Sequence, residues 1–266
     1  MTLNEITSKL NEYGAENPRE EALLIIEHTA KISRAQIMLD SQKSYTDPTI
    51  FEILEKRKEH IPLQYILGKW EFMGEEFLVS SDCLIPRPDT EILVEKSLSL
   101  TKDGAKVCDL CTGSGCIGIS IALKKRVELT LLDISNGALN MAKKNAALHG
   151  VEARFILGDL RNDMPSEKFD IITSNPPYIP SKDIDTLSPE VRNEPSLALD
   201  GGTDGLDLIK HLIFNTTSYL SEGGKMLIEF GYDQKSDIEG LMKETSLSYE
   251  ILYDYGKNPR ALVIYK

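Results

Sequence analysis

The feature that most constrains the fold of this chain is a glycine-rich loop in its middle. An apolar strand is expected at 105–110, and it runs into Asp109-Leu-Cys-Thr-Gly113-Ser-Gly115-Cys-Ile-Gly118 at the start of an expected helix, 116–125. The three glycines have the spacing that lets a backbone approach a nucleotide-type cofactor. Asp133 ends the next expected strand, where its carboxylate can accept hydrogen bonds from two ribose hydroxyls. The combination predicts a binding site for an adenosine-containing cofactor.

Strand and helix patterns alternate around this loop and continue to the end of the chain. Strands are expected at 105–110, 128–134, 153–158, 169–174, 224–230, 249–255 and 261–265. Helices are expected at 116–125, 137–149, 206–220 and 236–243. Repeated strand–helix units with apolar strands predict an α/β fold, with a mainly parallel seven-stranded sheet covered on both faces. The last two strands have only a short connection, which predicts an antiparallel last strand.

Three domains are expected along the chain. Residues 1–62 show apolar residues at helical spacing, with helix-start signals at Asn17-Pro18 and Asp47-Pro48. Residues 63–85 carry aromatic and β-branched residues punctuated by glycines, which predicts a hairpin connector. Residues 86–266 are expected to form the cofactor-binding domain. Its boundary with the connector lies within Ile85-Pro-Arg-Pro-Asp-Thr-Glu91, where Asp89 or Thr90 can cap the following helix.

Composition excludes several classes of function. The 266 residues include 30 Lys and Arg against 42 Asp and Glu, a net charge of −12, which disfavours general nucleic-acid binding. The basic run Lys56-Arg57-Lys58 is expected on the solvated face of a helix. No apolar run is long enough to span a membrane, and the N-terminus lacks a secretory signal, so we expect a cytoplasmic protein. Cys108, Cys111 and Cys116 are clustered, but they lie in a strand and a glycine-rich turn, so no metal site is expected.

Asp109 favours one adenosine cofactor over another. A carboxylate at the entrance of the loop would repel the pyrophosphate of a dinucleotide and attract a cationic ligand. S-adenosylmethionine carries a sulfonium and an ammonium group and no phosphate, so it is preferred. Asp159 and Leu160 end the third strand, where Asp159 could accept from the adenine amino group and Leu160 could cover the ring.

The motif Asn175-Pro-Pro-Tyr178 follows the fourth strand and predicts the chemistry. The nitrogen of an amide or aromatic amine is a poor nucleophile because its lone pair is delocalised. If the Asn175 side-chain oxygen and the Pro176 carbonyl each accept one of its N–H groups, electron density on the nitrogen rises and its lone pair is aimed. Tyr178 offers a face for the planar group. This pattern predicts nitrogen methylation, of either a protein amide or a nucleobase.

In their order, the motifs resemble those of the peptide chain release factor N(5)-glutamine methyltransferases, which have the Rossmann-like class I methyltransferase fold. The resemblance covers about residues 60–266. It rests on Pro62–Gly68, Ile85–Glu91, Asp109–Gly115, Asn175–Tyr178, Glu194-Pro195 and Ala198–Gly202. It implies methyl transfer from S-adenosylmethionine to the glutamine of the Gly-Gly-Gln motif of class-1 release factors. A nucleobase exocyclic-amine methyltransferase is the alternative, and an oxidoreductase ranks third because it leaves Asn175–Tyr178 without a role.

The resemblance also implies roles for individual residues. It implies contacts with S-adenosylmethionine from Cys111, Thr112, Gly113, Ser114, Gly115, Asp133 and Leu160, and we also expect contacts from Asp109, Asp159 and Asn175. Contacts with the substrate are expected from Asn175, Pro176, Pro177 and Tyr178, with Phe72 as a possible wall of the glutamine pocket. Catalysis is assigned to Asn175, Pro176 and Tyr178. The family usually has glycine where this chain has Cys111; a cysteine is tolerated there if its φ is negative, and with a positive φ the detailed path of the loop is in question. Arg87 is expected either to contact the cofactor carboxylate or the partner, or to form a structural ion pair.

Overall fold

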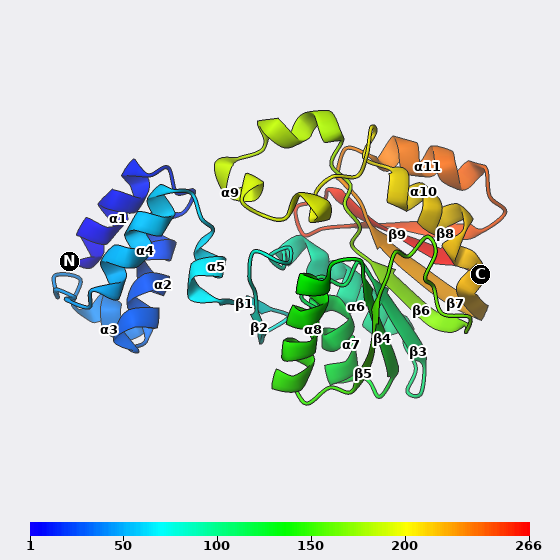
Figure 1. The fold of residues 1–266 in the computed structure, drawn as a ribbon, viewed down its shortest axis with the longest axis horizontal. Helices are drawn as coiled ribbons and strands as arrows, with labels where there is room; N and C mark the ends of the chain where they lie inside the picture. Colours follow the sequence, from blue (N-terminus) through cyan, green and yellow to red (C-terminus); the bar gives the residue numbers. More distant parts are fainter. The chain divides into compact units, whose positions relative to one another are not determined.

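The computed structural model describes residues 1–266, which form two compact units. The first unit comprises 1–68 and the short segment 188–193, and the second comprises 69–187 and 194–266 (Figure 1). None of the helices is long and apolar enough to cross a lipid bilayer.

A seven-stranded sheet organises the second unit, in the order β5-β4-β3-β6-β7-β9-β8. Its strands are β3 (Lys106–Leu110), β4 (Glu128–Asp133), β5 (Ala153–Leu157), β6 (Phe169–Ser174), β7 (Leu220–Glu229), β8 (Ser248–Tyr253) and β9 (Pro259–Tyr265). β9 runs antiparallel to both of its neighbours, and the other pairings are parallel. The predicted mainly parallel sheet with an antiparallel last strand is therefore confirmed. The chain leaves β3 towards β4 and returns to its other side as β6, and this reversal opens a crevice at the carboxyl ends of the strands.

Helices cover both faces of this sheet (Figure 1). On one face lie α6 (Glu91–Leu100), α7 (Cys116–Lys124) and α8 (Asn136–Leu148), and on the other lie α10 (Asp207–Phe214) and α11 (Lys235–Lys243). Successive strand residues alternate between the two cores, as a pleated strand requires: Val107 packs with α6–α8, whereas Cys108 packs with α10 and α11. The helix expected at 206–220 is shorter, because the chain turns after Phe214 and Leu220 already pairs with Phe169.

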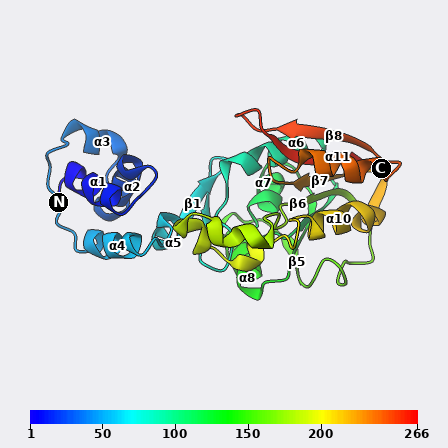
Figure 2. The ribbon, with the colours of Figure 1, turned by 90° about the horizontal axis from the view of Figure 1, so that it is seen from above.

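The first unit is helical, and Figure 2 shows its first four helices packed as one group. They are α1 (Leu3–Glu12), α2 (Pro18–Ala30), α3 (Arg34–Leu39) and α4 (Thr49–Lys58), followed by α5 (Leu63–Leu67). Apolar residues at helical spacing, among them Leu3, Ile6 and Leu10, form its own buried core. Pro18 occupies the start of α2 as predicted, but Asn17 makes no side-chain cap bond.

The predicted connector 63–85 begins differently from expectation. Leu63–Leu67 is a helix because Pro62 precedes its first turn and Gly68 ends it in the left-handed conformation, with φ 74°. A two-stranded hairpin then follows, β1 (Lys69–Phe72) paired with β2 (Glu75–Leu78).

Arg57 was expected on a solvated helix face, and the structure corrects this, because its side chain is only 2% exposed. Its guanidinium binds Glu21 at 2.7 Å and Glu190 at 2.5 Å, and it also donates to the Ile61 carbonyl. Glu190 lies in α9 (Pro189–Arg192), and Asn193 donates to the His60 carbonyl. These bonds explain why 188–193 belongs to the helical unit although the chain around it belongs to the other.

Candidate active site

The glycine-rich loop joins β3 to α7 in a path that only small residues allow. Gly115 immediately precedes α7 with φ 82°, and a Cβ there would lie 2.7 Å from the Ile119 Cδ1 atom. A Cβ on Gly118 would lie 2.6 Å from the Leu131 Cδ2 atom, so α7 packs directly onto the neighbouring strand. The loop thus brings the amino end of α7 to the carboxyl edge of the sheet, as the sequence pattern predicts.

Asp109 has a different position from the one we predicted. Its side chain is fully buried, and its carboxylate accepts from Thr112 Oγ1 at 2.5 Å, Thr173 Oγ1 at 2.7 Å and the Gly118 N–H at 3.3 Å. Burial raises the pKa of Asp109 to about 6, against these three hydrogen bonds. Because its oxygens already accept internal donors, Asp109 holds the loop in shape and does not line the cavity.

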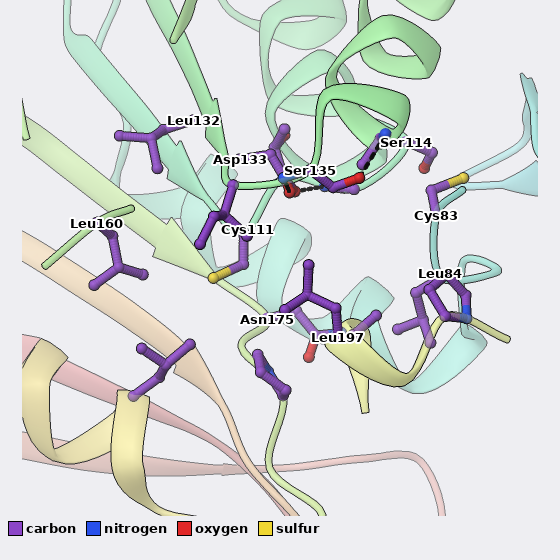
Figure 3. Close-up of a pocket in the computed structure, with 18 of the residues that line it drawn as sticks. Cys83, Leu84, Cys111, Ser114, Leu132, Asp133, Ser135, Leu160, Asn175 and Leu197 are labelled. Atoms are coloured by element: carbon purple, nitrogen blue, oxygen red, sulfur yellow. Dashed lines mark hydrogen bonds between the residues drawn. The ribbon is translucent and has the colours of Figure 1, made fainter. Parts of the chain in front are cut away.

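Asp133 takes the position predicted for a ribose-binding carboxylate. It ends β4, lines the cavity, and accepts from the N–H groups of Gly113 and Ser135, both at 2.8 Å. Figure 3 shows its carboxylate bonded to Ser135 at the cavity wall. Burial raises its pKa, whereas the backbone hydrogen bonds act in the opposite direction. These bonds fix the carboxylate in place and leave lone pairs for a ligand.

A cavity of about 470 Å³ lies beside this loop, within the size range of small-molecule sites. In Figure 3, Leu132 and Leu160 lie at one end, and Cys83 and Leu84 at the other. The acids that line it are Asp82, Asp133, Asp159, Asp200 and Asp207. The basic side chains that line it are Arg87 and Arg161, and each is paired, with Glu194 and Asp159 respectively. The cavity therefore has an excess of negative charge, which suits a cationic ligand.

Asp159 and Leu160, which follow β5, both line the cavity as predicted, but Asp159 already has a partner within the protein. Leu160 is buried and lines the cavity, so it is available to cover a planar ring. The Asp159 carboxylate also lies at the wall, but Arg161 binds it at 2.7 Å, and this pairing lowers the pKa of Asp159. Hydrogen bonding of Asp159 to adenine stays a prediction.

Cys111 departs from the expected backbone conformation. Its φ is 54°, in the left-handed region, so the condition of a negative φ, under which we expected a cysteine to be tolerated, is not met. The Thr112 N–H bonds to the Leu132 carbonyl at 3.1 Å, and Gly113 also has a positive φ of 57°. The loop thus follows its glycine-adapted path despite the cysteine, at a conformational cost of about 1 kcal/mol. The thiol points into the cavity between Leu160 and Asn175 (Figure 3).

Asn175-Pro-Pro-Tyr178 leaves β6 at the opposite side of the cavity from Asp133. Asn175 and Pro177 line the cavity. Among the hydrogen bonds of the protein, none is donated to the Asn175 side-chain oxygen or to the Pro176 carbonyl. Both predicted acceptors are therefore free to bond to an external N–H donor. Close packing explains the glycine at position 201 in the 198–202 motif, because a Cβ on Gly201 would lie 2.8 Å from the Pro177 carbonyl oxygen.

Two predicted substrate contacts are corrected. Phe72 is 1% exposed and packs against Phe77 in the core beneath α6 and α7, because residues alternate along its strand and this one faces inward. Tyr178 packs on the opposite core and does not line the cavity, because its hydroxyl donates to Glu229 Oε1 at 3.3 Å. Burial raises the pKa of Tyr178 well above its usual value.

Sequence reasoning missed a buried pair next to Asn175, formed by Thr90, which lines the cavity, and Glu229, which does not. Thr90 ends a 3₁₀ turn at Pro88–Thr90 and was predicted, as an alternative to Asp89, to cap the following helix, but it makes no cap bond. Its hydroxyl instead donates to Glu229 Oε2 at 2.6 Å, and the Asn175 Nδ2 group donates to Thr90 Oγ1 at 3.3 Å. Burial raises the pKa of Glu229 to about 7. No local pattern joins residues 90 and 229, so only the fold could reveal the pair.

Two further anchors were also missed. Glu194 accepts from the Ile85 N–H at 3.0 Å and from Arg87, which fixes the loop 194–202 beside the cavity and resolves Arg87 as an ion-pair partner. Asn145 of α8 is fully buried and donates to the Ser114 carbonyl at 2.8 Å and to the Leu78 carbonyl at 2.9 Å. It thus ties the glycine-rich loop to the β1–β2 hairpin.

Comparison with known proteins shows which families the chain is similar to. The family model for the PrmC N-terminal domain matches residues 2–68, and that for the methyltransferase small domain matches 88–190. The chain is 36% identical to the release factor glutamine methyltransferase of Geobacter sulfurreducens over 241 residues, 89% of this chain and 85% of that protein. It is 36% identical to the protein of the same name from Clostridium acetobutylicum, covering 96% of this chain and 94% of that one.

The fold also matches solved methyltransferases. A 16S rRNA methyltransferase of T. thermophilus, solved with AdoMet and guanosine, superposes with a TM-score of 0.53 at 16% sequence identity, covering 74% of this chain and 49% of that one. At this identity the likeness concerns the class I methyltransferase fold alone. Because the relatives described above are 36% identical over at least 89% of this chain, the chain belongs to the release factor glutamine methyltransferase family.

Proposed function

We propose that this enzyme transfers a methyl group from S-adenosylmethionine to the side-chain amide nitrogen of the glutamine in the Gly-Gly-Gln motif of class-1 peptide chain release factors. The observation that carries the proposal is that Asn175 lines an acid-rich cavity and that neither its Oδ1 atom nor the carbonyl of the adjacent Pro176 accepts a hydrogen bond within the protein, although Pro176 itself is not one of the lining residues. A primary amide has two N–H donors, and the site offers two fixed oxygens. The names of the full-length relatives support the same substrate.

The residues of the cavity fit S-adenosylmethionine. The Asp133 carboxylate is fixed by two backbone N–H groups and can accept from ribose hydroxyls, and Leu160 offers an apolar surface to an adenine ring. The surplus of carboxylates favours the sulfonium and ammonium charges over a pyrophosphate. When bound, this cofactor supplies an electrophilic methyl group on a positively charged sulfur.

Asn175 and Pro176 would orient and activate the amide nitrogen. By accepting both N–H groups they hold the amide plane and increase electron density on the nitrogen, which becomes the attacking atom. S-adenosylmethionine, held by Asp133 and Leu160, would supply the methyl group for the new N–C bond and would leave as the neutral thioether. The nitrogen then releases one proton to solvent, so no general base is required before attack.

The test is methylation of purified, unmodified release factor with methyl-labelled S-adenosylmethionine, followed by mass spectrometry of the Gly-Gly-Gln peptide. We expect one methyl group on the glutamine and none on a release factor with Gln replaced by Glu. Label that enters only tRNA or DNA in parallel reactions would overturn the proposal.

The role of Asn175 is tested with Asn175→Ala. We expect kcat to fall by about a hundredfold or more, while the Kd for S-adenosylmethionine changes by less than about threefold, since the loss concerns the reacting nitrogen. The exposed helical Asn140→Ala is the matched control and should retain full activity. Equal losses in kcat and cofactor affinity would show that Asn175 holds the cofactor.

A further inference from the structure

A carboxamide side chain can face a substrate with either of its two ends. The oxygen and the NH₂ group of Asn175 have nearly the same shape, so packing alone does not select between them. If the NH₂ end faced the site, it would meet the N–H groups of the substrate amide, donor against donor. The proposed function therefore requires something that fixes the amide with its oxygen towards the cavity.

The hydrogen bonds behind Asn175 provide this selection. Glu229 in its ionised form is an acceptor only, so the Thr90 hydroxyl must donate its one proton to Glu229 Oε2, at 2.6 Å. Thr90 Oγ1 then offers only lone pairs to Asn175, and it accepts from the Asn175 Nδ2 group at 3.3 Å. The direction of each bond follows from the one before it, starting at the carboxylate.

The surroundings keep this chain of bonds dry and directed. Thr90 is 2% exposed and Glu229 is 1% exposed, so water does not compete for the bonds. Tyr178 occupies the other oxygen of Glu229 as a second donor, at 3.3 Å. Two donors thus converge on one buried carboxylate. The series of hydrogen bonds that starts at this carboxylate ends at the Asn175 amide, whose oxygen is left for the cavity.

We infer that Thr90 is a positioning residue for methyl transfer, which uses the Glu229 carboxylate to hold the Asn175 amide with its oxygen towards the substrate nitrogen. The inference rests on the proposed function and deepens it. Glu229 does not line the cavity, and Thr90 lines it with its hydroxyl already bonded to Glu229 and Asn175, so the loss of either residue should affect turnover more than binding.

The experiment compares Thr90→Val, which keeps the shape but has no hydroxyl, with Thr90→Ser, which keeps the hydroxyl. Assays run at about pH 8.5, where an acid of the Glu229 pKa is ionised. For Thr90→Val we expect kcat to fall about tenfold or more, from the lost amide orientation, with KM for release factor and Kd for S-adenosylmethionine within about threefold of wild type. Thr90→Ser should recover kcat to within about threefold of wild type.

Thr101→Val is the matched control. Thr101 is a buried threonine at the other end of α6, and its hydroxyl bonds only to the Ser97 carbonyl within that helix. It should lose stability comparably to Thr90→Val but keep kcat. Thr90→Ala repeats the test if the valine variant fails to fold.

Several outcomes would overturn the inference while wild type still methylates release factor. They are an unchanged kcat in Thr90→Val, no recovery in Thr90→Ser, or cofactor affinity and kcat falling together. Absence of methyl transfer by wild type would instead refute the proposed function itself.

Discussion

The buried carboxylate of Asp109 makes a prediction that distinguishes its observed role from the one expected from sequence. Burial raises its pKa from 3.8 to about 6, although three donors bond to it. An acid with a raised pKa in the folded state binds its proton more tightly there than in the unfolded chain. Its contribution to stability is therefore fully present below pH 3.8 and is lost as the pH rises through 6.

The magnitude follows from that shift. A rise of the Asp109 pKa from 3.8 to about 6 corresponds to roughly 3 kcal/mol of unfolding free energy when the whole titration is covered. About 2 kcal/mol of this difference appears between about pH 8 and pH 4.5. The perturbation is Asp109→Asn, which has a similar shape and does not titrate. The other ionisable groups are the same in both proteins, so the difference between their unfolding free energies isolates Asp109.

Urea unfolding of both proteins at several pH values measures this difference. We expect wild type to gain about 2 kcal/mol relative to Asp109→Asn as the pH falls from about 8 to 4.5. A difference that does not vary with pH would refute the argument from burial. The opposite slope would show that the three hydrogen bonds outweigh desolvation and hold the carboxylate ionised.

Three other changes test the packing and the cofactor site. Arg57→Ala removes a buried guanidinium and leaves the part-buried carboxylates of Glu21 and Glu190 without their partner, so it should lower the unfolding free energy by about 3 kcal/mol in a urea titration; a loss below about 1 kcal/mol would contradict a structural role for these ion pairs. Asp133→Asn should weaken S-adenosylmethionine binding by about tenfold in calorimetry, and unchanged affinity would remove the ribose role. Gly118→Ala should lower the unfolding free energy by about 1–3 kcal/mol because its Cβ meets Leu131 at 2.6 Å, whereas Gly240→Ala, with open space around it, should not. Equal effects of the two glycine changes in thermal unfolding would contradict the close-packing argument.

The sheet could be predicted from sequence because its signals are local. Strand 169–174 was predicted with its observed bounds, and the antiparallel end strand followed from a short connection. The errors occurred where a local pattern is ambiguous. Leu63–Leu67 has the β-branched and aromatic content of a strand, but the flanking Pro62 and Gly68 favour one helical turn. The basic run around Arg57 gave no sign of burial, since its partners Glu21 and Glu190 are distant in sequence.

The site was predicted in part for the same reason. Residues at the strand ends, such as Asp133, Leu160 and Asn175, could be placed at the cavity because parallel strands end at one edge. The direction of a side chain could not be predicted, so Phe72 and Tyr178 were assigned to the substrate pocket although they pack in the two cores. Thr90 and Glu229 are separated by most of the domain, and their pairing depends on β7 lying beside β6.

Three carboxylates at one edge of the sheet show what decides whether an acid can bind a ligand. Asp109, Asp133 and Glu229 lie at or next to the last residues of β3, β4 and β7, so sequence position alone makes them equivalent. The donors that the protein already supplies make them different. Asp109 accepts two hydroxyls and one N–H, and Glu229 accepts two hydroxyls, all from the protein's own side chains or backbone. Asp133 accepts only backbone N–H groups at the cavity wall, so of the three it alone can meet a ligand, while the other two hold the loop and the amide that surround it.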